Sequence, residues 1–159
     1  GVNGVRTVLS ELGDVDFAIV GEPTSLQPAV AEKGLMVLDC VARGKAGHAA
    51  REEGVNAIYE ALSDIEWFRT HQMERVSPLL GAVKMTVTGI EAGTQHNVIP
   101  DECRFMVDIR VNECYQNEEL LAKIRQSVKC EVTPRSTHLN SWSMVAQPVL
   151  SHGNQMRLT

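Results

Sequence analysis

CRFMVDIRV, the stretch from Cys103 to Val111, alternates without interruption between apolar and mostly polar side chains. In an extended chain, successive side chains point to opposite faces. One face would carry Cys103, Phe105, Val107, Ile109 and Val111, and the other Arg104, Met106, Asp108 and Arg110. The stretch therefore predicts a strand that buries one face, while its other face is solvated or pairs with a partner.

Three more stretches have the pattern of strands. Val30–Arg43 is long and places Met36, Leu38, Cys40 and Ala42 on one face. Val83–Ile90 alternates with Val83, Met85 and Val87 inward, and Lys129–Thr133 is a short strand that Pro134 ends. The segments between them, Gly44–Ala50 and Gly93–Pro100, are rich in glycine or polar residues and indicate loops.

Two stretches have the period of amphipathic helices. The first runs from Asn56, a good N-cap, to His71, and its apolar stripe consists of Ile58, Ala61, Leu62, Ile65 and Phe68. The second is expected to be capped by Asn117, with Glu118 and Glu119 in the first turn, where the helix dipole favours them. Its core face would be Leu120 or Leu121, with Ile124 and Val128.

The resulting order is strand, helix, strand, strand, helix, strand. This order is typical of the ferredoxin-like split βαβ fold, an α+β arrangement in which two helices cover one face of a four-stranded antiparallel sheet. We assign this domain to residues 29–134. Residues 135–159 show no period and are expected to be a linker or irregular tail.

Residues 1–28 predict a helix followed by a short strand, Asp16–Val20, and resemble a fragment of a separate α/β domain. One helix and one strand cannot bury their own apolar faces, so they need neighbours from elsewhere. Glu22 follows the strand directly, at the kind of position where α/β sheets build their sites. Taken alone, Glu22 before Pro23 reads equally well as an acid in a surface turn.

Composition excludes several classes of protein. The net charge is −5, and no stripe of Lys and Arg supports nucleic-acid binding. No apolar run reaches membrane-spanning length and no signal peptide is recognisable, so we expect no membrane association. The four cysteines form no C-x-x-C pair and are read as reduced, mostly buried thiols of a cytoplasmic protein, although an even number also permits two disulfides.

Motifs of known chemistry are few. The five histidines include no H-E-x-x-H arrangement, and Gly44–Gly47 lacks the spacing of a phosphate-binding loop. Without further information, His48 reads as a surface residue of a glycine-rich loop. Arg110 reads as an exposed arginine paired with Asp108 or Glu102, and Asn97 as a turn residue before Val-Ile-Pro.

Four blocks in order change this interpretation. They are Val20-Gly21-Glu22-Pro23-Thr24, then Gly47-His48-Ala49-Ala50 with Gly54-Val55-Asn56-Ala57, then Asn97-Val98-Ile99-Pro100, then Asp108-Ile109-Arg110. Together they resemble the di-zinc amidohydrolase family of acetylornithine deacetylase, succinyl-diaminopimelate desuccinylase, aminoacylase and carboxypeptidase G2. Residues 21–28 resemble the acetylornithine deacetylase branch, which acts in arginine biosynthesis.

The resemblance implies a role for each matching residue. Glu22 would be a carboxylate ligand of one zinc, and His48 a lid histidine that crosses a homodimer and donates a hydrogen bond to the oxyanion of the amide. Asn97 would help to place the substrate, and Arg110 would bind its carboxylate. The chain would be the lid and dimerisation domain, with flanking pieces, of a hydrolase that cleaves N-acyl amino acids.

The resemblance also implies that most zinc ligands lie before Gly1 or after Thr159. The parent enzyme would hold two zinc ions per subunit, or cobalt in their place, whereas this chain alone is expected to bind no stable metal centre and to be inactive. We expect the homodimer to form through Val30–Arg43 as an edge strand and through the first helix, with Tyr59, Asp64 and Trp67 exposed.

Other interpretations remain open at this stage. Within the family, the parent could be a desuccinylase, an acylcitrulline deacylase or a dipeptidase. In a different class, the chain could be a non-catalytic ferredoxin-like module that binds a small molecule or only oligomerises.

Overall fold

The computed structural model describes Val8, Glu11, residues 29–51 and residues 53–143. Two helices are present there, α2 (Ala57–Thr70) and α3 (Asn117–Ser127). The longer strands are β2 (Gly34–Arg43), β4 (Lys84–Ala92), β6 (Glu102–Val111) and β7 (Glu131–Pro134). Four two-residue strands accompany them: β1 (Ala31–Glu32), β3 (Gly47–His48), β5 (Val98–Ile99) and β8 (Trp142–Ser143). Glu22, the strand expected before it and residues 144–159 lie outside the described residues.

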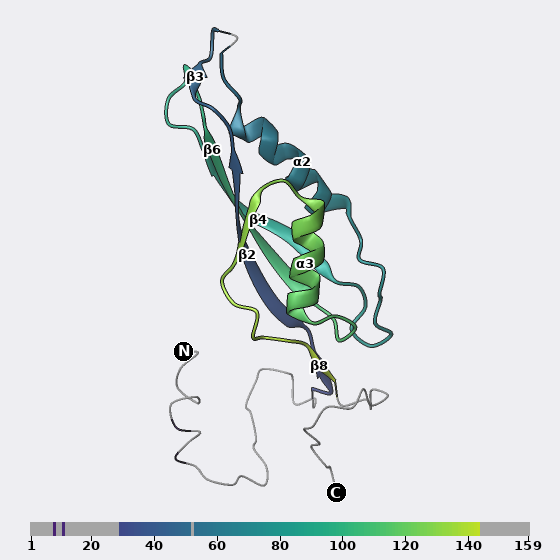
Figure 1. Cartoon of the computed structure of the whole chain (residues 1–159). Coiled ribbons are helices and arrows are strands. Elements are labelled where there is room, and N and C mark those ends of the chain that lie inside the picture. The colour runs from purple at the N-terminus through teal and green to yellow at the C-terminus, as the bar shows by residue number, and fades with distance from the viewer. Residues whose placement is uncertain (1–7, 9–10, 12–28, 52, 144–159) are drawn as a thin grey trace, which may run out of the picture.

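The four longer strands form one antiparallel sheet in the order β4-β6-β2-β7, and α2 and α3 cover the same face of it (Figure 1). This arrangement confirms the ferredoxin-like α+β fold. The expected long strand 30–43 divides into β1 and β2, and the two expected loops contain β3 and β5.

Strands β2 and β6 are in register over their whole length, from Gly34 opposite Val111 to Arg43 opposite Glu102. The alternation in the sequence matches the burial: the side chains expected inward on β2 and β6 are all buried, and Met85 and Val87 of β4 pack against them. The other face of the sheet mixes charged side chains, such as Asp39 and Arg104, with half-buried apolar ones, such as Val41 and Met106. Apolar burial against the two helices is therefore what fixes this register.

Helix α2 begins as expected, because Asn56 Oδ1 accepts a hydrogen bond from the N–H of Ile58 at 3.0 Å. Its buried face differs from the expected stripe. Leu62, expected in the core, is 52% exposed, whereas Asp64, expected to be exposed, is only 4% exposed. The buried residues are Ala57, Ala61, Asp64 and Phe68, so the buried stripe includes Asp64, whose carboxylate accepts from the N–H of Cys130, just before β7.

Helix α3 starts at Asn117, and Gln116 rather than Asn117 is its N-cap residue. The Asn117 side chain is fully buried, and its Nδ2 donates to the carbonyls of Thr137 (2.9 Å) and Leu139 (3.0 Å). Leu120 and Leu121 are both buried together with Ile124, so both leucines, and not only one of them, belong to the core face of α3.

Residues 135–143, expected to be a linker or tail, run back along the domain. The N–H of Leu35 donates to the carbonyl of Leu139 at 2.9 Å, and β8 pairs with β1. Gly34 permits this approach, because a Cβ there would lie 2.7 Å from the Leu139 oxygen. The segment that enters the domain and the segment that leaves it therefore lie side by side at one end of the sheet (Figure 1).

Val30–Arg43 was expected to supply an edge strand, and this is wrong for most of its length. β2 lies between β6 and β7, so both of its sides are paired. The edges are β4, nine residues long, and the short β7.

All four cysteines are free: Cys40 and Cys103 are buried, and Cys114 and Cys130 are half-buried. Burial raises the pKa of Cys103, and the neighbouring Cys40 thiol raises that of Cys130. Neither described helix is long and apolar enough to cross a membrane.

Candidate functional site

A slender extension leaves one end of the sheet beyond Arg43 and Glu102, the last opposed pair of β2 and β6. We call it the arm; its described part consists of residues 44–51, 53–56 and 93–101 and carries β3 and β5 (Figure 1). At its base the N–H of Gly44 donates to the carbonyl of Asp101 at 2.7 Å. Farther out, Lys45 and Val55 exchange two backbone hydrogen bonds of 2.8 and 2.9 Å.

Two glycines allow the arm to close. A Cβ on Gly47 would overlap the carbonyl oxygen of Glu53, and a Cβ on Gly44 would overlap that of Val55. The glycine-rich block in the sequence is therefore explained by close backbone contact, which only glycine permits.

His48 and Asn97 come together in the arm. His48 lies opposite Val98 in the β3–β5 pair, and the N–H of Ala49 donates to the carbonyl of Asn97 at 3.0 Å. The His48 ring is exposed, and its Nδ1 accepts a hydrogen bond from the N–H of Ala50 at 3.1 Å. In the neutral ring the proton then sits on Nε2, which makes His48 a hydrogen-bond donor at the surface of the arm.

Arg110 lies elsewhere. It is near the opposite end of β6, opposite Leu35 and Lys84, and forms a two-pronged ion pair with Asp108 (2.8 and 3.2 Å). Its side chain points to the open face of the sheet and is 49% exposed. The structure thus joins two of the expected site residues, His48 and Asn97, and separates the third from them.

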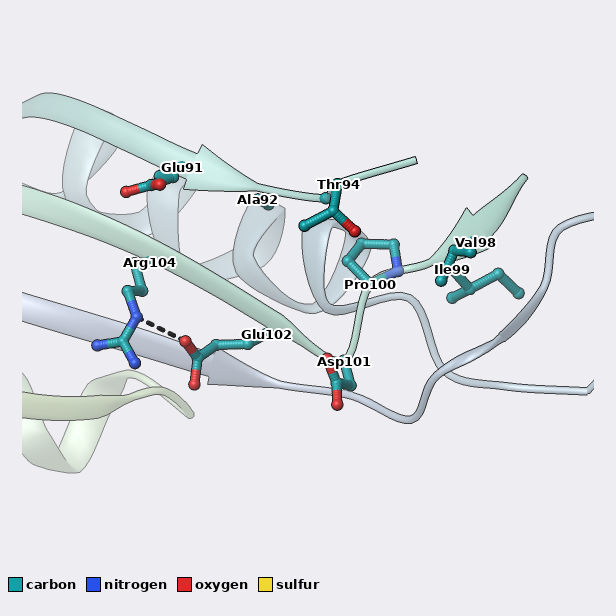
Figure 2. A pocket seen from close by; sticks show the side chains of 10 residues that line it. Glu91, Ala92, Thr94, Val98, Ile99, Pro100, Asp101, Glu102 and Arg104 are labelled. Carbon is teal, nitrogen blue, oxygen red and sulfur yellow. Dashed lines mark ion pairs between the residues drawn. The ribbon is translucent and has the colours of Figure 1, made fainter. Parts of the chain in front are cut away.

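A cavity of about 320 Å³ adjoins the arm on the sheet side. Val98 and Ile99 of β5 lie at one end of it, and Glu91 and Arg104 lie at the other (Figure 2). Sequence reasoning did not find this cavity, because the end of β4 and the turn before β6 form it together.

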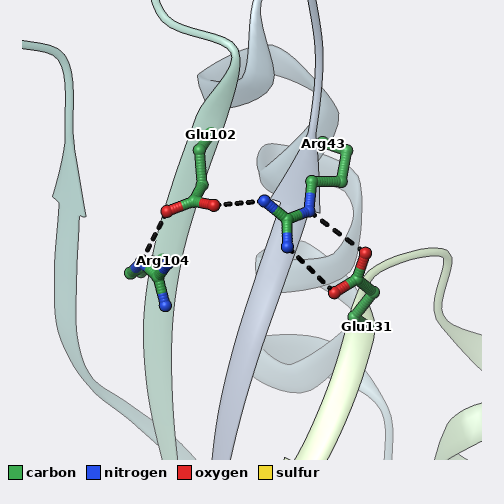
Figure 3. A network of polar contacts seen from close by, with 4 residues as sticks. All are labelled: Arg43, Glu102, Arg104 and Glu131. Atoms are coloured by element: carbon green, nitrogen blue, oxygen red, sulfur yellow. Dashed lines mark hydrogen bonds and ion pairs between the residues drawn. The ribbon is translucent and has the colours of Figure 1, made fainter.

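A network of charged side chains crosses the end of the sheet at the base of the arm (Figure 3). Arg43 forms an ion pair with Glu102 on β6 and a fork with Glu131 on β7 (3.1 and 3.2 Å). Arg104 binds the other oxygen of Glu102 at 2.5 Å. The Arg43 guanidinium lowers the pKa of Glu131, and Glu131 in turn is the main cause that raises the pKa of Arg43. No motif in the sequence indicated this network.

The described residues do not fit a zinc centre. Within residues 29–51 and 53–143, together with Val8 and Glu11, no group of three His, Cys, Asp or Glu side chains could hold a metal ion. His48 is the one histidine of the arm's β3–β5 pair, and its Nδ1 is already bonded to Ala50. Glu22, the expected ligand, lies outside the described part of the chain.

The sequence has clear relatives. Its residues 30–134 match the family described as the peptidase dimerisation domain of M20 proteins. An acetylornithine deacetylase of Myxococcus xanthus is 36% identical over 141 residues, which cover 80% of this chain and 37% of that protein. A peptidase M20 domain-containing protein of Schizosaccharomyces pombe is 35% identical over 69% of this chain and 28% of its own length. An acetylornithine deacetylase of Pectobacterium carotovorum is 38% identical over 60% of this chain and 27% of its own length. The chain thus spans well under half the length of these relatives.

Solved structures show the same fold. A tripeptidase of Staphylococcus aureus superposes with a TM-score of 0.65 at 22% identity, over 90% of this chain and 40% of that one. Aminopeptidase PepT of Bacillus cereus gives a TM-score of 0.54 at 19% identity, over 76% of this chain and 33% of that one. The sequence blocks, the family match over residues 30–134 and the fold agree, and the chain belongs to the M20 peptidase dimerisation domain family.

Proposed function

We propose that this chain is the dimerisation and lid domain of a hydrolase that cleaves the amide bond of N-acyl amino acids and is most like acetylornithine deacetylase. The observation that carries the proposal is the proximity of His48 and Asn97 on the exposed arm, where His48 pairs with Val98 and its Nδ1 accepts from the Ala50 N–H. The identity to acetylornithine deacetylases and the free cysteines, which suit a cytoplasmic enzyme, support it.

His48 has the chemistry of an oxyanion donor. Its Nε2–H would point at the carbonyl oxygen of the scissile amide, whose negative charge grows in the transition state. One such donor is worth about 3 kcal/mol of transition-state stabilisation. Asn97, next to it on the arm, would hold the acyl or amide part of the substrate through its carboxamide.

The position of Arg110 supports a site shared by two subunits. Eight residue steps separate Glu102, at the base of the arm, from Arg110 on β6, and at about 3.3 Å per step the distance is roughly 26 Å. No N-acetyl amino acid bridges that distance. If Arg110 binds the substrate carboxylate and His48 the reacting carbonyl, the arm of one subunit must therefore reach the site of the other.

The dimer is proposed to form along β4 and the flank of α2 beside it. β4 is the long edge of the sheet, and an open edge of this length calls for a partner or a cover. Leu62 lies about 200° around α2 from the buried Asp64, which contacts the residues just before β7, so Leu62 lies on the exposed side of the helix, away from β7. Leu62 is 52% exposed, and Ile90 of β4 is 58% exposed.

This surface replaces two of the expected contacts. Asp64 is buried and binds within its own subunit. Trp67 is half-buried, stacks on His71 with ring centroids 4.5 Å apart, and lies on the flank of α2 away from β4. Tyr59, which is 70% exposed, remains a candidate contact residue.

The metal ions of such a hydrolase would be held outside the described residues, where Glu22 is the ligand that the sequence offers. When bound, zinc would supply Lewis-acid activation of the amide and of water. The described residues contribute hydrogen bonding, substrate placement and subunit pairing.

Mixed dimers of the full-length enzyme test the proposal. We expect His48→Ala and Arg110→Ala subunits, each inactive alone, to recover activity when mixed. In the mixed dimer, one site would receive an intact histidine from one subunit and an intact arginine from the other. His48→Ala mixed with Glu22→Ala should recover activity in the same way.

The matched control is His48→Ala mixed with Asn97→Ala. Both residues lie on the same arm, so each site of this mixed dimer would lack one of them and activity should not recover. Recovery in this control, or none with Arg110→Ala in demonstrated heterodimers, would contradict the two-subunit site.

A further inference from the structure

The base of the arm joins it to the sheet, so contacts there set the orientation of His48 and Asn97 relative to the sheet. Arg43 is the last residue of β2 and precedes His48 by five positions, and Glu102 is the first residue of β6 and follows Asn97 by five. These two residues are directly opposite each other and form an ion pair. Both segments of the arm therefore leave the sheet next to one ion pair, Arg43–Glu102.

The network of ion pairs extends beyond Arg43 and Glu102. The planar guanidinium of Arg43 also binds both oxygens of Glu131 on β7, so it spans β6, β2 and β7 at once (Figure 3). Arg104 occupies the second oxygen of Glu102 and fixes its orientation from the β6 side. A bidentate fork is directional, which a single point charge is not.

Few other contacts restrain the arm. Its backbone bonds run mainly within it, such as those between Lys45 and Val55 and between Ala49 and Asn97. The bond from Gly44 N–H to the Asp101 carbonyl and that from Ala57 N–H to the Pro100 carbonyl lie at the base. His48, Ala49 and Ala50 are exposed, and none of residues 44–51, 53–56 and 93–101 belongs to the hydrophobic core of the domain.

We infer that Arg43 is a positioning residue: through Glu102 and Glu131 it holds the arm, and with it His48 and Asn97, in the direction required by the partner's site. The inference rests on the proposed function for the role of the arm. Because the ion pairs are half exposed, salt screens the attraction between their charges. The orientation of the arm is therefore expected to depend on ionic strength.

The same face of the sheet supplies a matched control. Arg135 makes a similar fork to Asp39, with both bonds at 2.9 Å, but at the middle of β2 and away from the arm. Arg135→Gln removes the same kind of ion pair from the same open face without touching the base of the arm.

The first experiment is hydrogen exchange of this chain and of its Arg43→Gln and Arg135→Gln variants. In Arg43→Gln, the amides of Lys45, Ala49 and Val55 should exchange about two- to fivefold faster, while those in the middle of β2 and β6 keep the wild-type rate. Arg135→Gln should leave the arm amides unchanged. Raising salt from about 0.05 M to about 1 M should accelerate the arm amides in the wild type but not in Arg43→Gln.

Arg43→Lys separates the effect of the bidentate geometry of the guanidinium from that of its positive charge. A lysine keeps the charge but reaches only one carboxylate at a time, so its arm exchange should fall between those of the wild type and Arg43→Gln. If Arg43→Gln does not fold, Glu131→Gln tests the same fork from β7. Equal arm exchange in Arg43→Gln and the wild type, or equal acceleration of arm and core amides, would overturn the inference.

Kinetics of the full-length enzyme separate the inference from the proposed function. Arg43→Gln should lower kcat about two- to fivefold and raise KM by a smaller factor, because an oxyanion donor acts chiefly in the transition state. If His48→Ala leaves activity intact, the proposed function fails whatever Arg43 does. If His48→Ala abolishes activity and Arg43→Gln leaves hydrogen exchange of the arm amides at the wild-type rate, only the positioning role of Arg43 fails.

Discussion

The carboxylate of Asp64, on helix α2, accepts hydrogen bonds from the backbone N–H groups of Cys130 at 2.8 Å and Lys129 at 3.1 Å. It ties the middle of the first helix to the turn that leads from α3 into β7. A charged side chain buried this deeply is costly unless its oxygens are bonded, and here backbone donors bond them.

Asp64→Ala should therefore destabilise the domain strongly, because it leaves two backbone N–H groups without an acceptor. We expect the free energy of unfolding to fall by about 2–3 kcal/mol, measured by urea denaturation. Asp64→Asn, which keeps one oxygen, should lose less. Glu60→Ala, an exposed acid on the same helix, is the control and should change little; an equal loss in both alanine variants would contradict the role of Asp64.

Gly47→Ala should disturb the arm, because the new methyl group would overlap the carbonyl oxygen of Glu53. We expect a loss of about 1–3 kcal/mol in local or global stability, seen as faster hydrogen exchange from Lys45 to Val55. Gly89→Ala on β4 is the comparison. Its Cβ would lie 3.3 Å from the flexible end of Met106, so that side chain can move aside. Similar arm exchange in the two variants would show that the close approach at Gly47 does not matter.

Asn117→Leu should release residues 135–143 from the domain. The substitution removes the Asn117 Nδ2 donors to the carbonyls of Thr137 and Leu139, and only the Leu139 carbonyl keeps another donor, the N–H of Leu35. Trypsin should then cleave after Arg135 several-fold faster than in the wild type, and the unfolding free energy should fall by about 1–3 kcal/mol. Gln116→Ala serves as the control, since Gln116 makes no side-chain capping bond. Unchanged cleavage in Asn117→Leu would refute the anchoring role.

Stability should fall in acid partly through Asp39. The hydrogen bonds from Arg135 hold the pKa of Asp39 below its ordinary value of 3.8. A carboxyl group with a lowered pKa stabilises the fold above its unfolded pKa, and this contribution disappears as pH falls through the folded value. Arg135→Gln should thus lower the urea midpoint slightly at pH 7, and this difference from the wild type should be smaller at about pH 3, because it shrinks as the Asp39 carboxyl becomes protonated. An equal difference at both pH values would contradict the linkage.

Self-association should depend on the β4 side of the domain. Leu62→Glu and Ile90→Lys each place a charge on the proposed contact surface and should shift a dimer toward monomer by at least tenfold in dissociation constant, measured by sedimentation. Gln126→Glu, on the exposed side of α3, adds a charge elsewhere and should leave association unchanged. A wild-type chain that sediments only as a monomer at micromolar concentration would refute dimerisation through this domain.

The alternating strand 103–111 and the helical stripe after Asn56 predicted most of the fold correctly. The burial of one face of β2 and β6 follows directly from their period of two, because a slip of one residue would turn every apolar side chain to solvent. The four ordered blocks also identified the family. His48, Asn97 and Arg110 were selected by the same blocks, and their roles stay predictions.

The sequence by itself determined where the four longer strands and the two helices lie and which faces of the strands are buried, since local periodicity and apolar burial decide both. The tertiary structure decided that β2 is central, that Asp64 rather than Leu62 faces inward, and that Asn117 anchors a returning segment. Each of these depends on a partner 20 or more residues away, such as Cys130 for Asp64 or Leu139 for Asn117. It also decided that Arg43, Glu102 and Glu131 meet at the base of the arm, because only strand order brings three distant residues to one edge.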